Sequence, residues 1–91
     1  IKQDERLLFD YYLIKGQANL GMGKYMQAIE DLEEGNRIYN SDTRLLNSLG
    51  FCYYKTAQKA RAVEVLNASL RLNPQQEDVK KLLEEIEKGS D

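Results

Sequence analysis

The chain has 91 residues, of which 42% are hydrophobic and 31% are charged, and its formal net charge is −2. This length supports one domain without a second core, and the balanced charge provides no global basic field that would attract nucleic acid. The sequence has no histidine, which removes the commonest general base and metal ligand. Cys52 is the single cysteine, so no internal disulfide can form.

Hydrophobic residues recur at three- and four-residue steps through most of the chain, which is the period of an α-helix. The first predicted helix covers residues 4–20 and ends at Gly21-Met22-Gly23, because glycine destabilises a helix interior and permits turn dihedrals. The second covers residues 25–39. Asn40-Ser41-Asp42 then ends this helix and supplies an N-cap for a third helix, residues 43–55.

A turn at Thr56-Ala57-Gln58 precedes a fourth predicted helix, residues 59–72, which ends at Asn73-Pro74 because the residue before proline is pushed out of the helical region. The fifth predicted helix, about residues 76–88, is charged except for one hydrophobic stripe, which predicts a terminal helix that covers the stack and exposes a polar back. We therefore predict an all-α chain of about five helices in antiparallel hairpins. The stripe of the fifth helix consists of Val79, Leu82, Leu83 and Ile86.

The chain also repeats itself at one fixed offset, the distance in sequence from residue 9 to residue 43. Related positions at one fixed offset indicate two copies of one structural unit, residues 9–42 and 43–76. In the first copy, Lys15 and Asn19 stand where the second has Leu49 and Tyr53, so we expect the first copy to be the looser one. The seven pairs are Tyr12 with Leu46, Gly16 with Gly50, Ala18 with Cys52, Ala28 with Ala62, Leu32 with Leu66, Ile38 with Leu72, and Asn40 with Pro74.

The second copy carries Leu46, Leu49-Gly50, Tyr53, Ala62, Leu66 and Pro74. These residues have the spacing of the tetratricopeptide pattern, a large residue followed by x2-L-G-x2-Y, then A, then x3 and a large apolar residue, then P. The stretch therefore resembles one tetratricopeptide repeat, a helix-turn-helix unit. The resemblance implies a right-handed superhelical array in a single domain, 1–91. Within it, residues 1–8 extend the first helix, 77–88 form a capping helix and 89–91 fray. It also implies close-contact pairs of small residues where helices cross, Gly16 with Ala28 and Gly50 with Ala62.

In tetratricopeptide arrays the first helix of each repeat lines a concave face that binds peptides or protein segments. Aromatic side chains among Arg and Asn are typical peptide anchors, which draws attention to Phe51 and Tyr54. These two could instead pack against the capping helix or the preceding repeat, and the sequence leaves both alternatives open. By the resemblance, the face would be lined by Asp10, Leu13, Ile14, Gln17, Leu20 and Gly21 from the first copy and by Arg44, Asn47, Ser48, Phe51, Tyr54 and Lys55 from the second.

The family's best-defined peptide site, the carboxylate clamp that grips the C-terminal carboxylates of heat-shock chaperones, is absent. Its Lys and two Asn positions hold Leu13, Gln17 and Ser48 here. The sequence also lacks a nucleophile–base pair, a phosphate loop or a metal cluster, so we expect neither catalysis nor a cofactor from this segment. The acidic run Glu30-Asp31-Glu33-Glu34 lacks the glycine turn of calcium loops, which predicts a solvated helix face.

The expected partner is a protein or peptide. A basic patch of Arg44, Lys55, Lys59 and Arg61 is too small to indicate nucleic acid, and the hydrophobic runs are too short for a membrane span. Three functions stay open: an interaction module of a larger scaffold or adaptor protein, a stacking or self-association unit of a longer solenoid, and a regulatory segment of a larger enzyme. Because the first helix is hydrophobic around much of its girth, from Leu7 to Ile14, we expect upstream repeats or a second copy of the chain to cover it.

Overall fold

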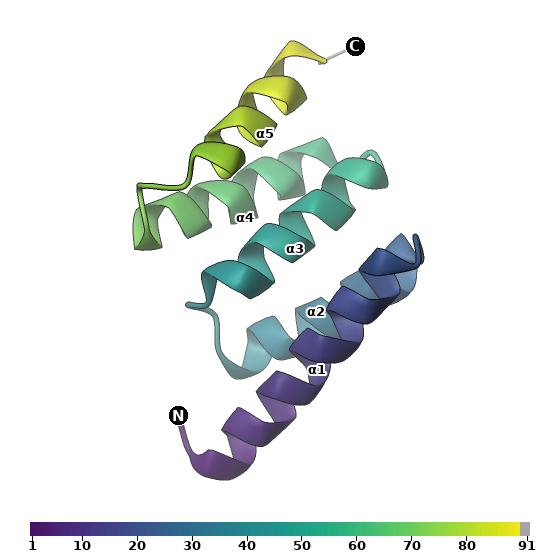
Figure 1. Cartoon of the computed structure of the whole chain (residues 1–91), viewed down its shortest axis with the longest axis vertical. Helices are drawn as coiled ribbons and strands as arrows, with labels where there is room; N and C mark the ends of the chain where they lie inside the picture. Colours follow the sequence, from purple (N-terminus) through teal and green to yellow (C-terminus); the bar gives the residue numbers. More distant parts are fainter. Residues whose placement is uncertain (90–91) are drawn as a thin grey trace.

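A computed structural model describes residues 1–89, so residues 90–91 of the predicted tail lie outside the described part of the chain. The described part contains five α-helices, as predicted, and their ends lie within one residue of the predicted ones. Successive helices are antiparallel, and α1, α3 and α5 run in the same direction across Figure 1. The helices are α1 (Gln3–Gly21), α2 (Tyr25–Ile38), α3 (Thr43–Lys55), α4 (Lys59–Leu72) and α5 (Glu77–Lys88).

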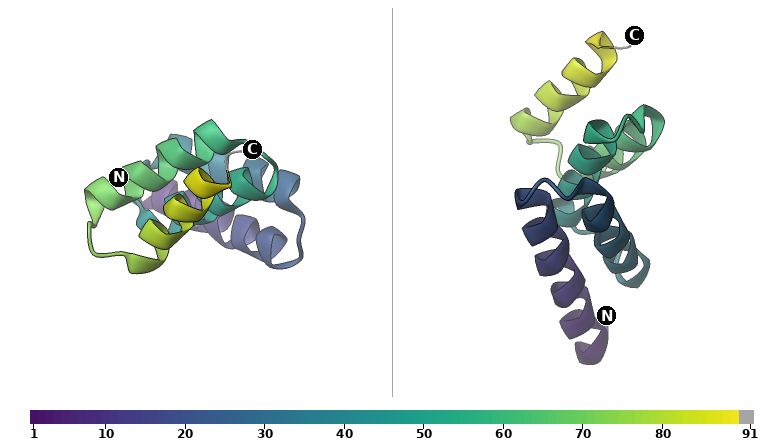
Figure 2. Two further views of the ribbon diagram at one scale, coloured as in Figure 1. Left: turned by 90° about the horizontal axis from the view of Figure 1, so that it is seen from above. Right: turned by 90° about the vertical axis from the view of Figure 1, so that its right-hand side faces the viewer.

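The helices form two hairpins and a final single helix in an elongated stack. The extents are 42 × 28 × 18 Å, and the two perpendicular views in Figure 2 show the stacking. α1 pairs with α2 and α3 with α4, while α3 packs on α2 and α5 packs on α4. One hydrophobic core runs through all five helices, and α5 joins it through its predicted stripe. The buried members of the core include Phe9, Leu13, Ile29, Leu32, Leu45, Leu49, Tyr53, Leu66, Val79, Leu83 and Ile86.

Gly16 and Gly50 set the distance between the two helices of each hairpin. A Cβ atom at Gly16 would lie 2.6 Å from side-chain atoms of Leu32, and a Cβ atom at Gly50 would lie 2.6 Å from side-chain atoms of Leu66. The leucines therefore make the closest approach, and the alanines that we predicted as partners are buried but are not the nearest side chains. Leu32 and Leu66 are both fully buried, so the first copy is not the looser one at this crossing, contrary to our expectation.

The two hairpin turns use the same left-handed backbone position, one repeat apart. Gly23 has φ +76° in the first turn, and Ala57 has φ +62° in the second. Glycine adopts this region without steric cost, whereas the Cβ of alanine clashes with the following carbonyl oxygen at a cost of roughly 1–2 kcal/mol. The second turn is therefore strained at Ala57.

Replacing this alanine should relieve the strain. We expect Ala57→Gly to raise the free energy of unfolding by about 0.5–1 kcal/mol, because the strain removed exceeds the extra chain entropy of glycine in the unfolded state. The matched change Gly23→Ala should lower it by about 1 kcal/mol through backbone strain alone, since nothing lies within 4 Å of the added Cβ. Urea unfolding followed by circular dichroism measures both, and a loss of stability in Ala57→Gly would contradict the assignment of strain.

Adding a methyl group at the helix crossing should lower the free energy of unfolding. Gly50→Ala must displace the buried Leu66 side chain, an overpacking cost of about 1–3 kcal/mol, which outweighs the gain of up to about 1 kcal/mol in helix propensity. Gly21→Ala is the control, because no atom lies within 4 Å of its added Cβ. Thermal unfolding should show a lower melting temperature for Gly50→Ala and no loss for Gly21→Ala.

Candidate protein-binding face

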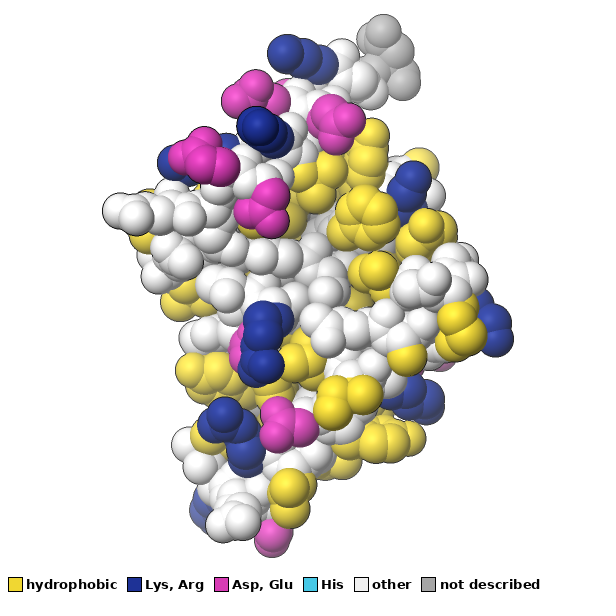
Figure 3. Space-filling model, in the orientation of Figure 1, with side chains coloured by type: hydrophobic (Ala, Val, Ile, Leu, Met, Phe, Trp, Pro, Cys, Tyr) yellow, Lys and Arg dark blue, Asp and Glu magenta, His cyan; other side chains and the backbone are white. Residues whose placement is uncertain are grey.

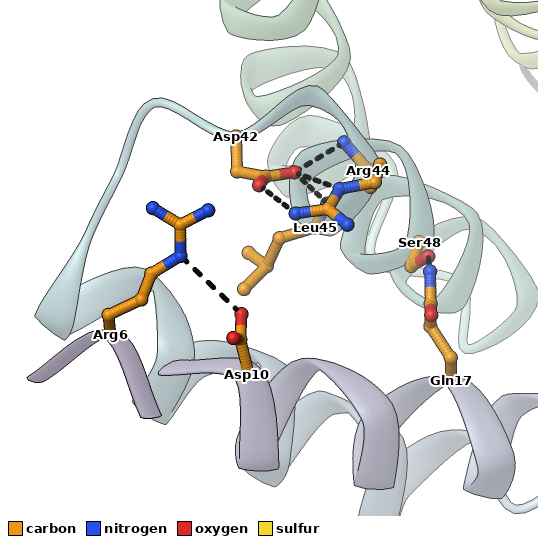
Figure 4. A network of polar contacts seen from close by, with 7 residues as sticks. All are labelled: Arg6, Asp10, Gln17, Asp42, Arg44, Leu45 and Ser48. Atoms are coloured by element: carbon orange, nitrogen blue, oxygen red, sulfur yellow. Dashed lines mark hydrogen bonds and ion pairs between the residues drawn. The ribbon is translucent and has the colours of Figure 1, made fainter. Parts of the chain in front are cut away.

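The surface of interest lies where α1 and α3 run side by side, with α2 behind α1 in Figure 1. We call this surface the first-helix face. Gln17 Nε2 of α1 donates to Ser48 Oγ of α3 at 3.4 Å, across the line where the two helices meet (Figure 4). Nearer the N-terminus of α1, Asp10 pairs with Arg6 at 3.8 Å. Asp10, Gln17 and Ser48 thus lie at the surface where α1 and α3 meet.

Asp42 precedes α3 and is its N-cap, as the sequence indicated. The carboxylate accepts hydrogen bonds from the backbone N–H of Arg44 at 2.9 Å and of Leu45 at 3.3 Å. The Arg44 guanidinium also folds back onto it, with Nε–Oδ1 at 3.1 Å and Nη2–Oδ2 at 2.6 Å (Figure 4). Hydrogen bonding from Arg44 lowers the pKa of Asp42. The positive charge of Arg44 therefore faces its own N-cap and is only partly available to a partner.

Phe51 forms an aromatic and cationic patch together with Tyr25 and Lys55. Its ring meets the Tyr25 ring edge-on at a centroid distance of 6.2 Å, and Lys55 Nζ lies 5.6 Å from the centroid of the Phe51 ring. Phe51 and Tyr25 are partly buried, and Lys55 is exposed. Figure 3 shows hydrophobic surface over the C-terminal half of α3, beside α5. Tyr25 was not predicted, because it comes from the start of α2 and no first-helix pattern includes it.

Three residues that we predicted to bind a partner pack in or against the hydrophobic core instead. Leu13 is 3% exposed and belongs to the core, so it offers no side chain to a partner and its prediction as a binding residue is wrong. Leu20 and Tyr54 are partly buried and pack against the hydrophobic core. Ile14 is 66% exposed, and it lies one helical turn from Asp10 and Gln17 as well as from Tyr11, so it stands at the edge between the first-helix face and the outer side of α1.

The Asn47 side chain forms hydrogen bonds to other residues of the chain. Its Nδ2 donates to Gln76 Oε1 at 2.8 Å, and its Oδ1 accepts from Ser69 Oγ at 2.6 Å. Gln76 Nε2 donates in turn to Ser69 Oγ at 3.1 Å and to the Asn73 carbonyl at 2.9 Å. The network joins α3, α4 and the residue before α5. Both polar atoms of the Asn47 amide are therefore used within the chain, which corrects its prediction as a binding residue.

The acidic run on α2 is not a solvated face throughout. Asp31 is 8% exposed and accepts a hydrogen bond from Asn19 Nδ2 at 2.8 Å, while Lys15 Nζ lies 3.5 Å from its other oxygen. The Asp31 charge raises the pKa of Lys15. Two residues further along, Glu33 accepts a hydrogen bond from the Tyr53 hydroxyl of α3. The pKa of Tyr53 is raised, chiefly by burial and then by this carboxylate.

The structure also bears on metal binding, on membrane crossing and on the reactivity of Cys52. Among residues 1–89, no group of three or more potential ligands is arranged to hold a metal ion. No described helix combines the length and the hydrophobicity that crossing a bilayer requires. Cys52 is fully buried, and desolvation raises the pKa of its thiol to about 11. Burial therefore disfavours the thiolate, which is the nucleophilic form of cysteine.

Hairpins that recur at one fixed sequence offset and stack through one core define a helical-repeat protein. The tetratricopeptide repeat family model matches residues 19–86. The chain belongs to the tetratricopeptide repeat family, whose members are generally non-catalytic protein–protein interaction modules. No curated protein matches the chain.

The N-cap at Asp42 predicts a pH-dependent stability. Because the folded-state pKa of Asp42 is lowered, its stabilisation is present above the ordinary aspartate pKa of about 3.9 and is lost as the pH falls through the lower folded value. Asp42→Ala should cost about 1 kcal/mol at pH 7 and less at pH 3.

Urea unfolding of both proteins at the two pH values measures this difference. Asp42→Asn is the control, because asparagine caps a helix without titrating. An equal effect of Asp42→Ala at both pH values would contradict the role of the carboxylate.

Proposed function

We propose that the chain is a non-catalytic interaction module that binds a segment of another protein across the first-helix face. Two repeats, residues 9–42 and 43–76, and a capping helix form the unit. The observation that supports this proposal is Phe51, a partly exposed aromatic side chain outside the core cluster, with a lysine ammonium beside its ring. Large aromatic anchors of this kind contribute most of the binding energy in protein interfaces.

The chemistry of the face favours a segment with an apolar or aromatic side chain followed by a carboxylate. The apolar group would contact Phe51 and Tyr25, and Lys55 would pair with the carboxylate. The amide of Gln17 and the hydroxyl of Ser48 are polar groups that can bind a peptide backbone. Residues 43–76 contain five basic residues and one acidic residue, which raises the association rate of an acidic segment.

A peptide array tests this proposal. Acidic peptides with an aromatic residue should be captured by the chain, and fluorescence anisotropy then gives their dissociation constants. We expect Phe51→Ala to weaken binding by about fivefold or more, because an anchor residue contributes more than about 1 kcal/mol. Lys55→Ala should weaken the acidic peptides selectively, and more at low salt.

Leu72→Ala is the matched control, because Leu72 is an exposed hydrophobic residue at the end of α4, away from this face. Circular dichroism confirms that each variant is folded. If Phe51→Ala and Lys55→Ala both bind every captured peptide as well as the unmodified chain does, the first-helix face is not the binding site.

A further inference from the structure

α1 carries four large hydrophobic side chains that no other described part of the chain covers. Leu7, Leu8, Tyr11 and Ile14 are 62%, 47%, 53% and 66% exposed. They recur at three- and four-residue steps, so they form one stripe along the helix, on the side away from the buried Leu13. We call this stripe the outer face of α1.

The corresponding side of α3 and of α5 is buried. Leu45 and Val79, which stand one and two repeats after Tyr11, are 0% and 3% exposed. Cys52 and Ile86, two turns further along the same two helices, are 0% and 2% exposed. α3 packs on α2 and α5 packs on α4. Thus α3 and α5 each bury against another helix the side that α1 exposes as its outer face.

Nearer its C-terminus, the same side of α1 is polar at positions that a stacked repeat would contact. Lys15 and Asn19 stand one repeat before Leu49 and Tyr53 of α3, which are buried. Both side chains are bound to Asp31 within their own hairpin. Lys15, Asn19 and Asp31 form a polar cluster. A helix that packed on α1 as α2 packs on α3 would lie over this cluster.

The hydrophobic stripe lies closer to the N-terminus of α1. α1 has 19 residues against 13 in α3, and it begins six residues before the position that corresponds to Thr43. Leu7 and Leu8 lie in this extension. Tyr11 shares the docking position of Leu45, but Leu7 and Leu8 lie on its N-terminal side, beyond the docking register of the repeats. Their position argues for a partner helix other than that of a stacked repeat.

We propose that the outer face of α1 binds the same face of a second copy of the chain, with the two α1 helices antiparallel about a two-fold axis near Tyr11. A two-fold interface joins the same patch of both copies. In this arrangement Leu7 and Leu8 of one copy contact Ile14 of the other. The hydrophobic stripe is thereby covered, and of the polar cluster only Lys15, whose side chain is 52% exposed, lies within the paired stretch.

Charge selects the antiparallel orientation. Asp4 lies on the outer face seven residues before Tyr11, and Lys15 lies four residues after it. Antiparallel pairing brings Asp4 of one copy to within about 4.5 Å, along the helix axis, of the level of Lys15 of the other, which a lysine side chain can span. Parallel pairing would place Asp4 beside Asp4 and Lys15 beside Lys15, and like charges repel.

Analytical ultracentrifugation of the 91-residue chain over a concentration series tests the dimer. A single helix pair is small for a specific interface, so we expect the mass to rise with concentration from 10.5 kDa toward twice that value. Leu8→Glu should weaken dimerisation by more than about tenfold, since burying an unpaired charge costs more than the 1.4 kcal/mol that a factor of about ten represents. Leu72→Glu is the matched control, because both leucines are 47% exposed. It should dimerise like the unmodified chain.

Cross-linking tests the orientation. Tyr11→Cys should form a disulfide between copies under mild oxidation, whereas Asp4→Cys should not, and Cys52 gives little background because it is fully buried. A monomer at every concentration, or a Leu8→Glu variant that dimerises normally, would overturn the proposal, and equal cross-linking at both positions would overturn the antiparallel orientation. These results are independent of the proposed peptide binding, since Phe51 and Lys55 lie on α3 and outside this interface.

Discussion

The close approach of two helices at a glycine is the constraint on which the rest of this structure depends. Gly16 against Leu32 and Gly50 against Leu66 leave no space for a methyl group, so each hairpin closes at a defined distance. That distance determines which side chains of α1 and α3 enter the core and which remain at the surface. Phe51 lies one residue after Gly50, about 100° around the helix. It is therefore turned away from the contact between α3 and α4, and its ring meets that of Tyr25 of α2.

The two repeats use the same backbone with different chemistry at equivalent positions. In the second repeat Leu49 is buried against α2, and the Tyr53 hydroxyl bonds to Glu33. In the first repeat Lys15 and Asn19 bond to Asp31 instead. A hydrophobic interface between the two repeats and a polar cluster on α1 and α2 thus come from a few substitutions. This difference gives α1 a surface unlike that of α3 although their backbones correspond.

The sequence predicted the scaffold well and the surface less well. Helix ends were predictable because glycines, Asp42 and Asn73-Pro74 act locally, within a few residues of the ends they define. The role of Asn47 was not predictable, because its partners Ser69 and Gln76 are 22 and 29 residues away. Its side chain was therefore assigned to a partner that it does not face.

By itself, the sequence determined the number of helices, their pairing into hairpins and the recurrence of the hairpin unit along the chain, because these follow from hydrophobic periodicity and from local turn chemistry. Only the tertiary structure decided which side chains remain available at the surface. Leu13 and Phe51 both occupy first-helix positions, yet Leu13 is sealed in the core and Phe51 is partly exposed beside Lys55. The physical reason is that exposure depends on which neighbouring helix covers a residue, and contacts between helices are not encoded in any local stretch of the chain.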